Sequence, residues 1–162
     1  MYFFPFIVNS FLSFINSIKL VALDSIDYSN INLKCMLHNL NKMEEFYGFA
    51  GQTFGNNVLF YCTFGSCSSL EKIVMCSINA TNLTDIGACF SGCNSLAYVD
   101  FSFFNAPSLT SSYVGGWFNG CVSNVNIIFY GATLAISNNN FFSACSFPSN
   151  SIFPLSLICG IL

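Results

Sequence analysis

The sequence predicts an α/β solenoid: a stack of turns of roughly 25 residues, each with one short parallel strand and an irregular or short helical connection. Three observations lead to this prediction. A Phe-x-x-Cys cue recurs along the chain, apolar residues alternate after each copy, and hydrophobic side chains make up 54% of the composition. The length of 162 residues suits one ordinary domain.

The recurring cue is a phenylalanine followed three positions later by a cysteine. Its four copies begin 26, 28 and 24 residues apart, and Phe14 and Leu37 occupy the same frame in earlier, weaker copies. The flanking residues repeat as well, since Cys-x-Ser-Leu follows in two of the copies. The copies are Phe64–Cys67, Phe90–Cys93, Phe118–Cys121 and Phe142–Cys145.

The residues after each cue alternate between apolar and polar side chains, as in a short strand with one buried face. We expect two sets of side chains to point inward: Leu70, Ile73 and Met75, then Leu96, Val99 and Phe101. This L-x-x-L-x-L pattern is typical of leucine-rich repeats. Between strands, the apolar spacing of residues 83–90 fits one or two helical turns, and Gly92 and Gly120 supply the bend that follows.

The sequence divides into three parts. Residues 14–150 form about five turns, residues 1–13 are an apolar N-terminal segment (a signal, an anchor or a degenerate cap), and residues 151–162 are an apolar tail. Neither end resembles the polar cap that a solenoid needs. We expect neighbouring turns, a partner or a membrane to cover the ends, with residues 1–23 as the membrane-associating segment, and the isolated chain to self-associate.

Composition narrows the function classes. With four Lys+Arg against seven Asp+Glu, the chain has no basic patch for phosphates, so no nucleic-acid partner is expected. The nine cysteines include no CxxC pair, and no metal or cofactor is expected. Because one cysteine per turn occupies a buried bend in leucine-rich repeats, we interpret four of them as a structural ladder: Cys67, Cys93, Cys121 and Cys145. A disulfide among the less regular cysteines stays open.

No catalytic residue is predicted. His38 is the only histidine and falls where the repeat places a solvated turn residue. Glu44 and Glu45 are adjacent, and adjacent strand residues point to opposite faces. Asn79-Ala-Thr and Asn82-Leu-Thr are acceptor sequences for N-glycosylation in an exported eukaryotic chain. A thiol-dependent enzyme is kept only as a remote alternative.

The outward side chains of the strands form the most informative predicted surface. Repeat proteins bind partners through such extended faces, and tyrosine supplies rigid contact area with a polar tip. The alternative is that these are merely solvated strand positions. The candidate partner-binding residues are Glu45, Tyr47, Lys72, Val74, Tyr98, Asp100, Asn126 and Ile128, and the same alternation adds Ala22 and Asp24 in the first turn.

Residues 78–101 resemble the BspA-like leucine-rich repeat, which reads F-D-T-S-N-V-T-x-M-x-x-M-F-x-x-C-x-S-L-x-x-L-D-L; residues 104–110 match its start. The resemblance is sharp over residues 64–121 and looser from 14 to 150. It implies a non-enzymatic, surface-displayed adhesion module that binds a protein, extracellular-matrix or cell-surface ligand, in an extracellular or cell-surface location. A cytoplasmic interaction scaffold of the same fold is the main alternative.

Overall fold

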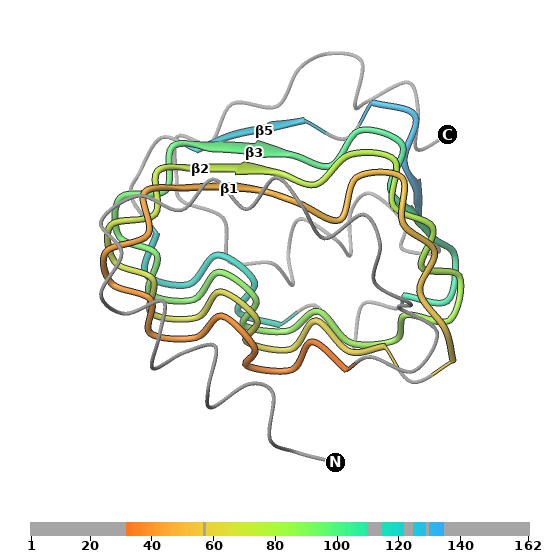
Figure 1. Cartoon of the computed structure of the whole chain (residues 1–162), viewed down its shortest axis with the longest axis horizontal. Coiled ribbons are helices and arrows are strands. Elements are labelled where there is room, and N and C mark those ends of the chain that lie inside the picture. Colours follow the sequence, from red (N-terminus) through yellow and green to blue (C-terminus); the bar gives the residue numbers. More distant parts are fainter. Residues whose placement is uncertain (1–31, 57, 110–114, 122–124, 129, 135–162) are drawn as a thin grey trace.

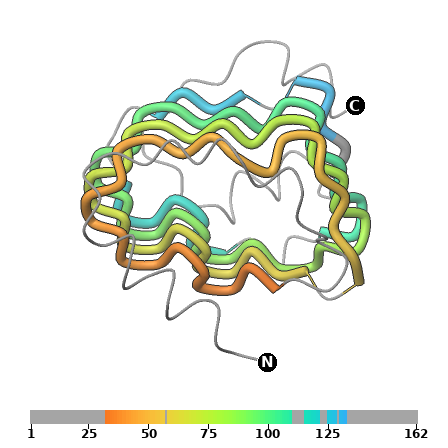
Figure 2. Tube along the Cα trace, in the orientation of Figure 1, coloured from red at the N-terminus to blue at the C-terminus, as the bar shows by residue number. Residues whose placement is uncertain are grey.

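The computed structural model describes residues 32–56, 58–109, 115–121, 125–128 and 130–134. Over these ranges the backbone winds as a flattened coil whose successive turns lie on one another (Figures 1 and 2). The segments at 1–31 and 135–162 lie outside the described residues. The expected N-terminal segment, the C-terminal tail, Phe14, Ala22, Asp24 and the Phe142–Cys145 copy therefore stay predictions.

Four three-residue strands build one parallel sheet in the order β1-β2-β3-β5. Their bounds are β1 Glu45–Tyr47, β2 Lys72–Val74, β3 Tyr98–Asp100 and β5 Asn126–Ile128. Equivalent residues of successive turns pair directly, so Phe46 pairs with Ile73 and Ile73 with Val99. The predicted short parallel strand in each turn is thereby confirmed for these four turns.

A second, narrower ladder runs along the edge of the coil that follows the strands. Strand β4, Asn105–Ala106, pairs in parallel with β6, Thr133–Leu134. Isolated parallel bridges continue the ladder from Asn105 to Asn79 and from Asn79 to Thr53. The two ladders share the residue spacings of 26 and 28 at the second and third steps and differ by one residue at the first, 27 against 26. The cross-section therefore repeats beyond the strands, with one extra residue between β1 and Thr53 in the first turn.

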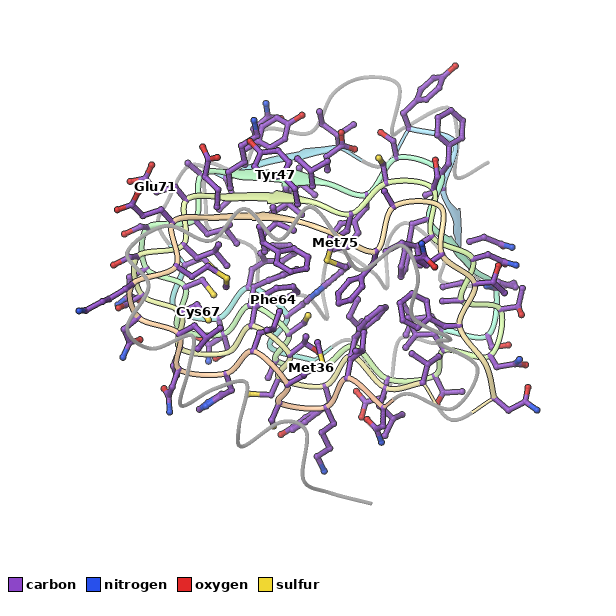
Figure 3. The ribbon with its side chains drawn as sticks, in the orientation of Figure 1. Met36, Tyr47, Phe64, Cys67, Glu71 and Met75 are labelled. Carbon is purple, nitrogen blue, oxygen red and sulfur yellow. The ribbon has the colours of Figure 1, made fainter. Side chains whose placement is uncertain are left out.

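The core lies inside the coil and follows the alternation predicted from the sequence. Each strand of the main sheet has a buried central residue between two half-buried ones. The inward sets expected around β2 and β3 are all fully buried. Stacked aromatic rings continue the core between turns, with 5.5 Å between the ring centroids of Phe64 and Phe90 and 5.2 Å between those of Phe90 and Phe118. Figure 3 shows Phe64 and Met75 pointing into this interior.

The side of the coil opposite the sheet consists of tight turns. The helical turns anticipated over residues 83–90 are absent: no described residue lies in a helix. Amides instead alternate between two kinds of acceptor. The Phe90 amide donates to the Trp117 carbonyl of the next turn, whereas the Cys93 amide donates to the Phe90 carbonyl three residues back. In this segment, apolar side chains with the spacing of a helix therefore belong to stacked turns that are not helical.

The bends after these segments need left-handed backbone, as the glycines suggested. Gly92 and Gly120 both have a φ of +77°, and Asn39 and Ser66 adopt φ of +64° and +59° at the equivalent positions. Left-handed φ is freely available to glycine and tolerated by asparagine. Within the described part of the chain, no helix has the length and apolarity to cross a membrane.

We predict that Phe90→Ala lowers the free energy of unfolding by about 3–5 kcal/mol, because it empties a fully buried site between the rings of two neighbouring turns. Urea denaturation monitored by circular dichroism measures this loss. The matched control is Phe103→Ala, whose ring is 53% exposed and packs edge-on against Tyr130. Its loss should stay below about 1.5 kcal/mol. Equal losses in the two variants would contradict a core inside the coil.

Candidate functional site

The outward residues of the four strands form a continuous surface, here called the outer face. They lie in two rows, each joining equivalent positions of successive turns. All are half-buried, so their side chains combine contact with their neighbours and access to solvent. Figure 3 shows Tyr47 projecting away from the coil. The first row is Glu45, Lys72, Tyr98 and Asn126; the second is Tyr47, Val74, Asp100 and Ile128. The geometry thus brings together all eight candidate residues, and their role in binding stays a prediction.

Lys72 stands at the centre of the outer face between two tyrosines. Its Nζ lies 5.1 Å from the ring centroid of Tyr47 and 5.4 Å from that of Tyr98. The neighbouring Tyr47 side chain raises the pKa of Lys72 above its ordinary value, and nearby negative charge on Glu45 adds to this. Cation–π attraction fixes the position of a side chain that would otherwise sample many rotamers. The result is a pre-positioned Tyr-Lys-Tyr cluster that spans three adjacent strands.

Carboxylates surround this cluster. Partial burial raises the pKa of Tyr98, and the charge of Asp100 on the same strand raises it further. The Asp100 carboxylate accepts a hydrogen bond from the Ser102 amide at 2.8 Å, which holds it in place. Glu45 pairs in register with Lys72. The outer face is therefore acidic at its margins and carries one cation at its centre.

Two further carboxylates belong beside the outer face, and the sequence reasoning missed them. Glu44 and Glu71 immediately precede β1 and β2, are exposed, and are joined through the backbone because the Glu71 amide donates to the Glu44 carbonyl at 2.7 Å. Figure 3 shows Glu71 outside the coil. The sequence pattern placed Glu44 and Glu45 on opposite faces of one strand. This was wrong for Glu44, which lies before the strand. The available signal was the recurrence of glutamate in the same repeat frame.

The cysteine ladder takes part in hydrogen bonds from turn to turn. The Cys67 thiol donates to the Leu37 carbonyl at 3.0 Å, that of Cys93 to the Phe64 carbonyl at 3.0 Å, and that of Cys121 to the Phe90 carbonyl at 3.2 Å. Each acceptor belongs to the first residue of the cue in the preceding turn. Cys67 and Cys93 are fully buried and Cys121 is half-buried against the core, while Cys145 lies outside the described residues.

Burial makes the ladder thiols poor nucleophiles. It raises the pKa of Cys67 to about 12 and that of Cys121 to about 12, and it also raises the pKa of Cys93 and Cys89. The thiolate is the reactive form of cysteine, so these groups are chemically inert at neutral pH. The electrostatics favour the structural interpretation of the ladder over a redox or metal array. No set of three His, Cys, Asp or Glu side chains within the described ranges is arranged to hold a metal ion.

Asparagines stack along the edge that carries β4. The Asn105 side-chain amide donates to the Asn79 side-chain oxygen at 2.9 Å, and that of Asn82 donates to Asn56 at 2.8 Å. Asn79 is half-buried within this stack, whereas Asn82 is exposed. Of the two glycosylation sequences, the one at Asn82 is therefore the more accessible.

His38 lies in a turn, as expected, but it is half-buried rather than solvated. Its ring borders Gly65 in the next turn: a methyl group placed on Gly65 would stand 2.9 Å from His38 Cδ2 and would collide with the Cys62 thiol. The histidine therefore has a cysteine nearby, which the sequence did not reveal because the two residues belong to different turns.

Comparison with known proteins adds no relative: no protein-family model, curated protein or solved structure matches this chain.

We predict that alkali weakens the fold partly through Cys67. The unfolded thiol ionises near pH 9, whereas the folded one keeps its proton until about pH 12. The stabilisation is therefore complete below pH 9 and is lost progressively as pH rises from 9 towards 12. Between about pH 8 and pH 10.5, the wild-type chain should lose about 1–2 kcal/mol more unfolding free energy than Cys67→Ser, which keeps a donor for Leu37 but does not ionise. Urea titrations at both pH values measure the difference. Parallel losses would contradict a buried neutral thiol.

Proposed function

We propose that the chain is a leucine-rich-repeat solenoid of the BspA-like kind, displayed outside the cell, whose outer face binds a protein or cell-surface ligand without catalysis. The observation that carries this proposal is the Tyr47–Lys72–Tyr98 cluster on the exposed side of a stacked parallel sheet. Tyrosines that are already held in place lose little conformational freedom on binding, and aromatic residues dominate the energetics of protein interfaces.

The charges on this surface favour a partner with basic groups. Glu44 and Glu71 are exposed and occupy equivalent positions of neighbouring turns, so two negative charges lie on adjacent turns of the coil. Like charges at directly opposite positions of a sheet lower its stability. A basic partner would relieve the repulsion, and the same carboxylates would repel nucleic acid or an anionic membrane. Lys72, held by two rings, would then select the orientation of the partner rather than attract it.

The cytoplasmic scaffold of the same fold differs from this proposal in location alone. External protease added to intact cells of the source organism separates the two. A displayed chain should be cleaved while a cytoplasmic marker protein survives, and protection of the chain until lysis would favour the scaffold. The membrane-associating role of residues 1–23 stays a prediction outside the described residues.

The thiol-dependent enzyme has less support. It requires a cysteine that ionises near neutral pH, and burial and the neighbouring Cys35 together raise the pKa of Cys62, the cysteine beside Gly65 and His38, to about 11. A histidine that activates a thiol is hydrogen-bonded to it, and His38 and Cys62 share no such bond. These two features argue for a non-catalytic chain.

We predict that Lys72→Ala and Tyr98→Ala each weaken attachment of the full chain by about tenfold or more, since each removes part of a central contact cluster. The measurement is attachment of beads coated with the chain to immobilised extracellular-matrix proteins and to cultured cells. Attachment of the wild-type chain should also weaken as salt is raised, because its carboxylates contribute.

Lys34→Ala is the matched control. Lys34 also stacks on a tyrosine, with its Nζ 5.3 Å from the Tyr61 ring centroid, but these two residues belong to the turns on the side opposite the sheet. This variant should attach like the wild type. Equal losses at Lys72 and Lys34, or no loss at either, would show that the outer face is not the binding surface.

A further inference from the structure

Two cysteines meet on the side of the coil opposite the sheet. Cys35 and Cys62 occupy equivalent positions in consecutive turns, and both have a φ of +54°. The Cys35 amide donates to the Tyr61 carbonyl at 3.0 Å and the Leu37 amide to the Thr63 carbonyl at 2.9 Å. In parallel pairing this pattern places Cys35 directly beside Cys62.

Their spacing suits a covalent link. Directly paired residues of neighbouring parallel segments lie about 4.8 Å apart, within the Cα separation of about 4.4–6.8 Å that disulfides span. Burial and the neighbouring Cys35 thiol together raise the pKa of Cys62, as expected for two thiols that lie close together. The Cys35 sulfur leans towards the next turn, 4.0 Å from the Tyr61 carbonyl oxygen. Both cysteines are half-buried, so a small reagent can reach them.

Gly65 makes room for this pair. The Cys62 sulfur fills the space that a side chain at Gly65 would occupy, between the backbone and the His38 ring. In the following turn the equivalent residues are Ala88 and Ser91, so neither a thiol nor a glycine is present at these two positions. The thiol pair and the glycine that accommodates it therefore occur together in one place of the repeat.

We propose that Cys35 and Cys62 are a redox-active pair that forms a disulfide between two consecutive turns by exchange with a low-molecular-weight disulfide such as oxidised glutathione. One thiolate attacks a sulfur of the small disulfide, forming a mixed disulfide and releasing one small thiol. The second thiolate then attacks the protein sulfur of the mixed disulfide and displaces the other small thiol. Two electrons and two protons pass to the reagent, which leaves as two thiols.

The surroundings keep the buried ladder thiols out of this reaction. The ladder thiols of Cys67 and Cys93 are fully buried and already donate to backbone carbonyls, so the reagent does not reach them. The raised pKa of Cys62 makes its thiolate scarce at neutral pH. Formation of the disulfide should therefore be slow near pH 7 and accelerate as pH rises. Such slow exchange suits a structural disulfide and not the active site of a thiol–disulfide oxidoreductase.

The link would fasten two turns whose cysteines are 27 positions apart in sequence. Closing a loop of this size restricts the unfolded chain and stabilises the folded one. Small disulfides oxidise protein thiols outside the cell, whereas the cytosol keeps them reduced. The reaction does not depend on what the outer face binds, so failure of either proposal leaves the other standing.

The full chain, fully reduced and folded, is incubated in a series of buffers with increasing ratios of oxidised to reduced glutathione. Remaining thiols are alkylated and the digest is mapped by mass spectrometry. We expect a peptide pair joined through Cys35 and Cys62, reversed by dithiothreitol, while Cys67 and Cys93 become alkylated only after denaturation. The midpoint of thermal unfolding should rise by about 5–15 °C on oxidation.

Cys35→Ser should leave Cys62 as a mixed disulfide with glutathione and abolish the thermal shift. Cys76→Ser, which removes another half-buried thiol, should retain both the link and the shift. The wild-type map decides the question even if a variant fails to fold. The proposal is overturned if Cys35 and Cys62 remain separately alkylatable at oxidising buffer compositions, or if either joins a different cysteine.

Discussion

The constraint on which the structure depends is the register between turns. An amide in one turn donates to a carbonyl of the next, as Phe64 does to Cys89 and Phe90 to Trp117, so equivalent residues stand on one another. No single turn could bury its apolar side chains alone, and the stack supplies the missing surface. This register determines the continuous aromatic core, the thiol-to-carbonyl ladder and the rows of the outer face. The register holds although successive strand partners lie 27, 26 and 28 residues apart, so the connections between strands absorb the differences in turn length.

The same register explains why the strands could be predicted and the connections could not. Alternation has a period of two, and each strand carries one buried residue between two half-buried ones, so pattern and structure agree at Lys72–Val74 and Tyr98–Asp100. Residues 83–90 have apolar spacing that a short helix would also produce. The amides of Ala88 and Phe90 instead donate to carbonyls of the next turn, and these acceptors cannot be seen in the sequence of a single repeat. Contacts between turns, such as His38 with Gly65, were hidden for the same reason.

Cysteine chemistry in this chain is governed by position in the cross-section. At the bend before the strand, thiols point inward and donate to carbonyls of the preceding turn, and burial suppresses their ionisation. On the side opposite the sheet, Cys35 and Cys62 lie side by side in adjacent turns and are only half-buried. Stacking brings like residues together in both places. The ladder thiols are inert because they are buried and donate to backbone carbonyls. The Cys35–Cys62 pair can be oxidised because solvent reaches it.

Stacking of like residues also lowers stability where the stacked residues carry charge, and this occurs beside the outer face. A repeat that places Glu44 beside Glu71 sets like charges close together, although neutral residues occupy the equivalent position at Ala97 and Val125. Stability alone would favour the neutral choice. In the Tyr-Lys-Tyr cluster, two rings likewise hold the flexible Lys72 side chain in one place, which costs conformational entropy. Both features reduce the contribution of these residues to the free energy of folding. Both also give the surface a defined charge and shape. Both features lie on or beside the outer face, and they are the reason why we propose this face as the part of the coil that recognises a partner.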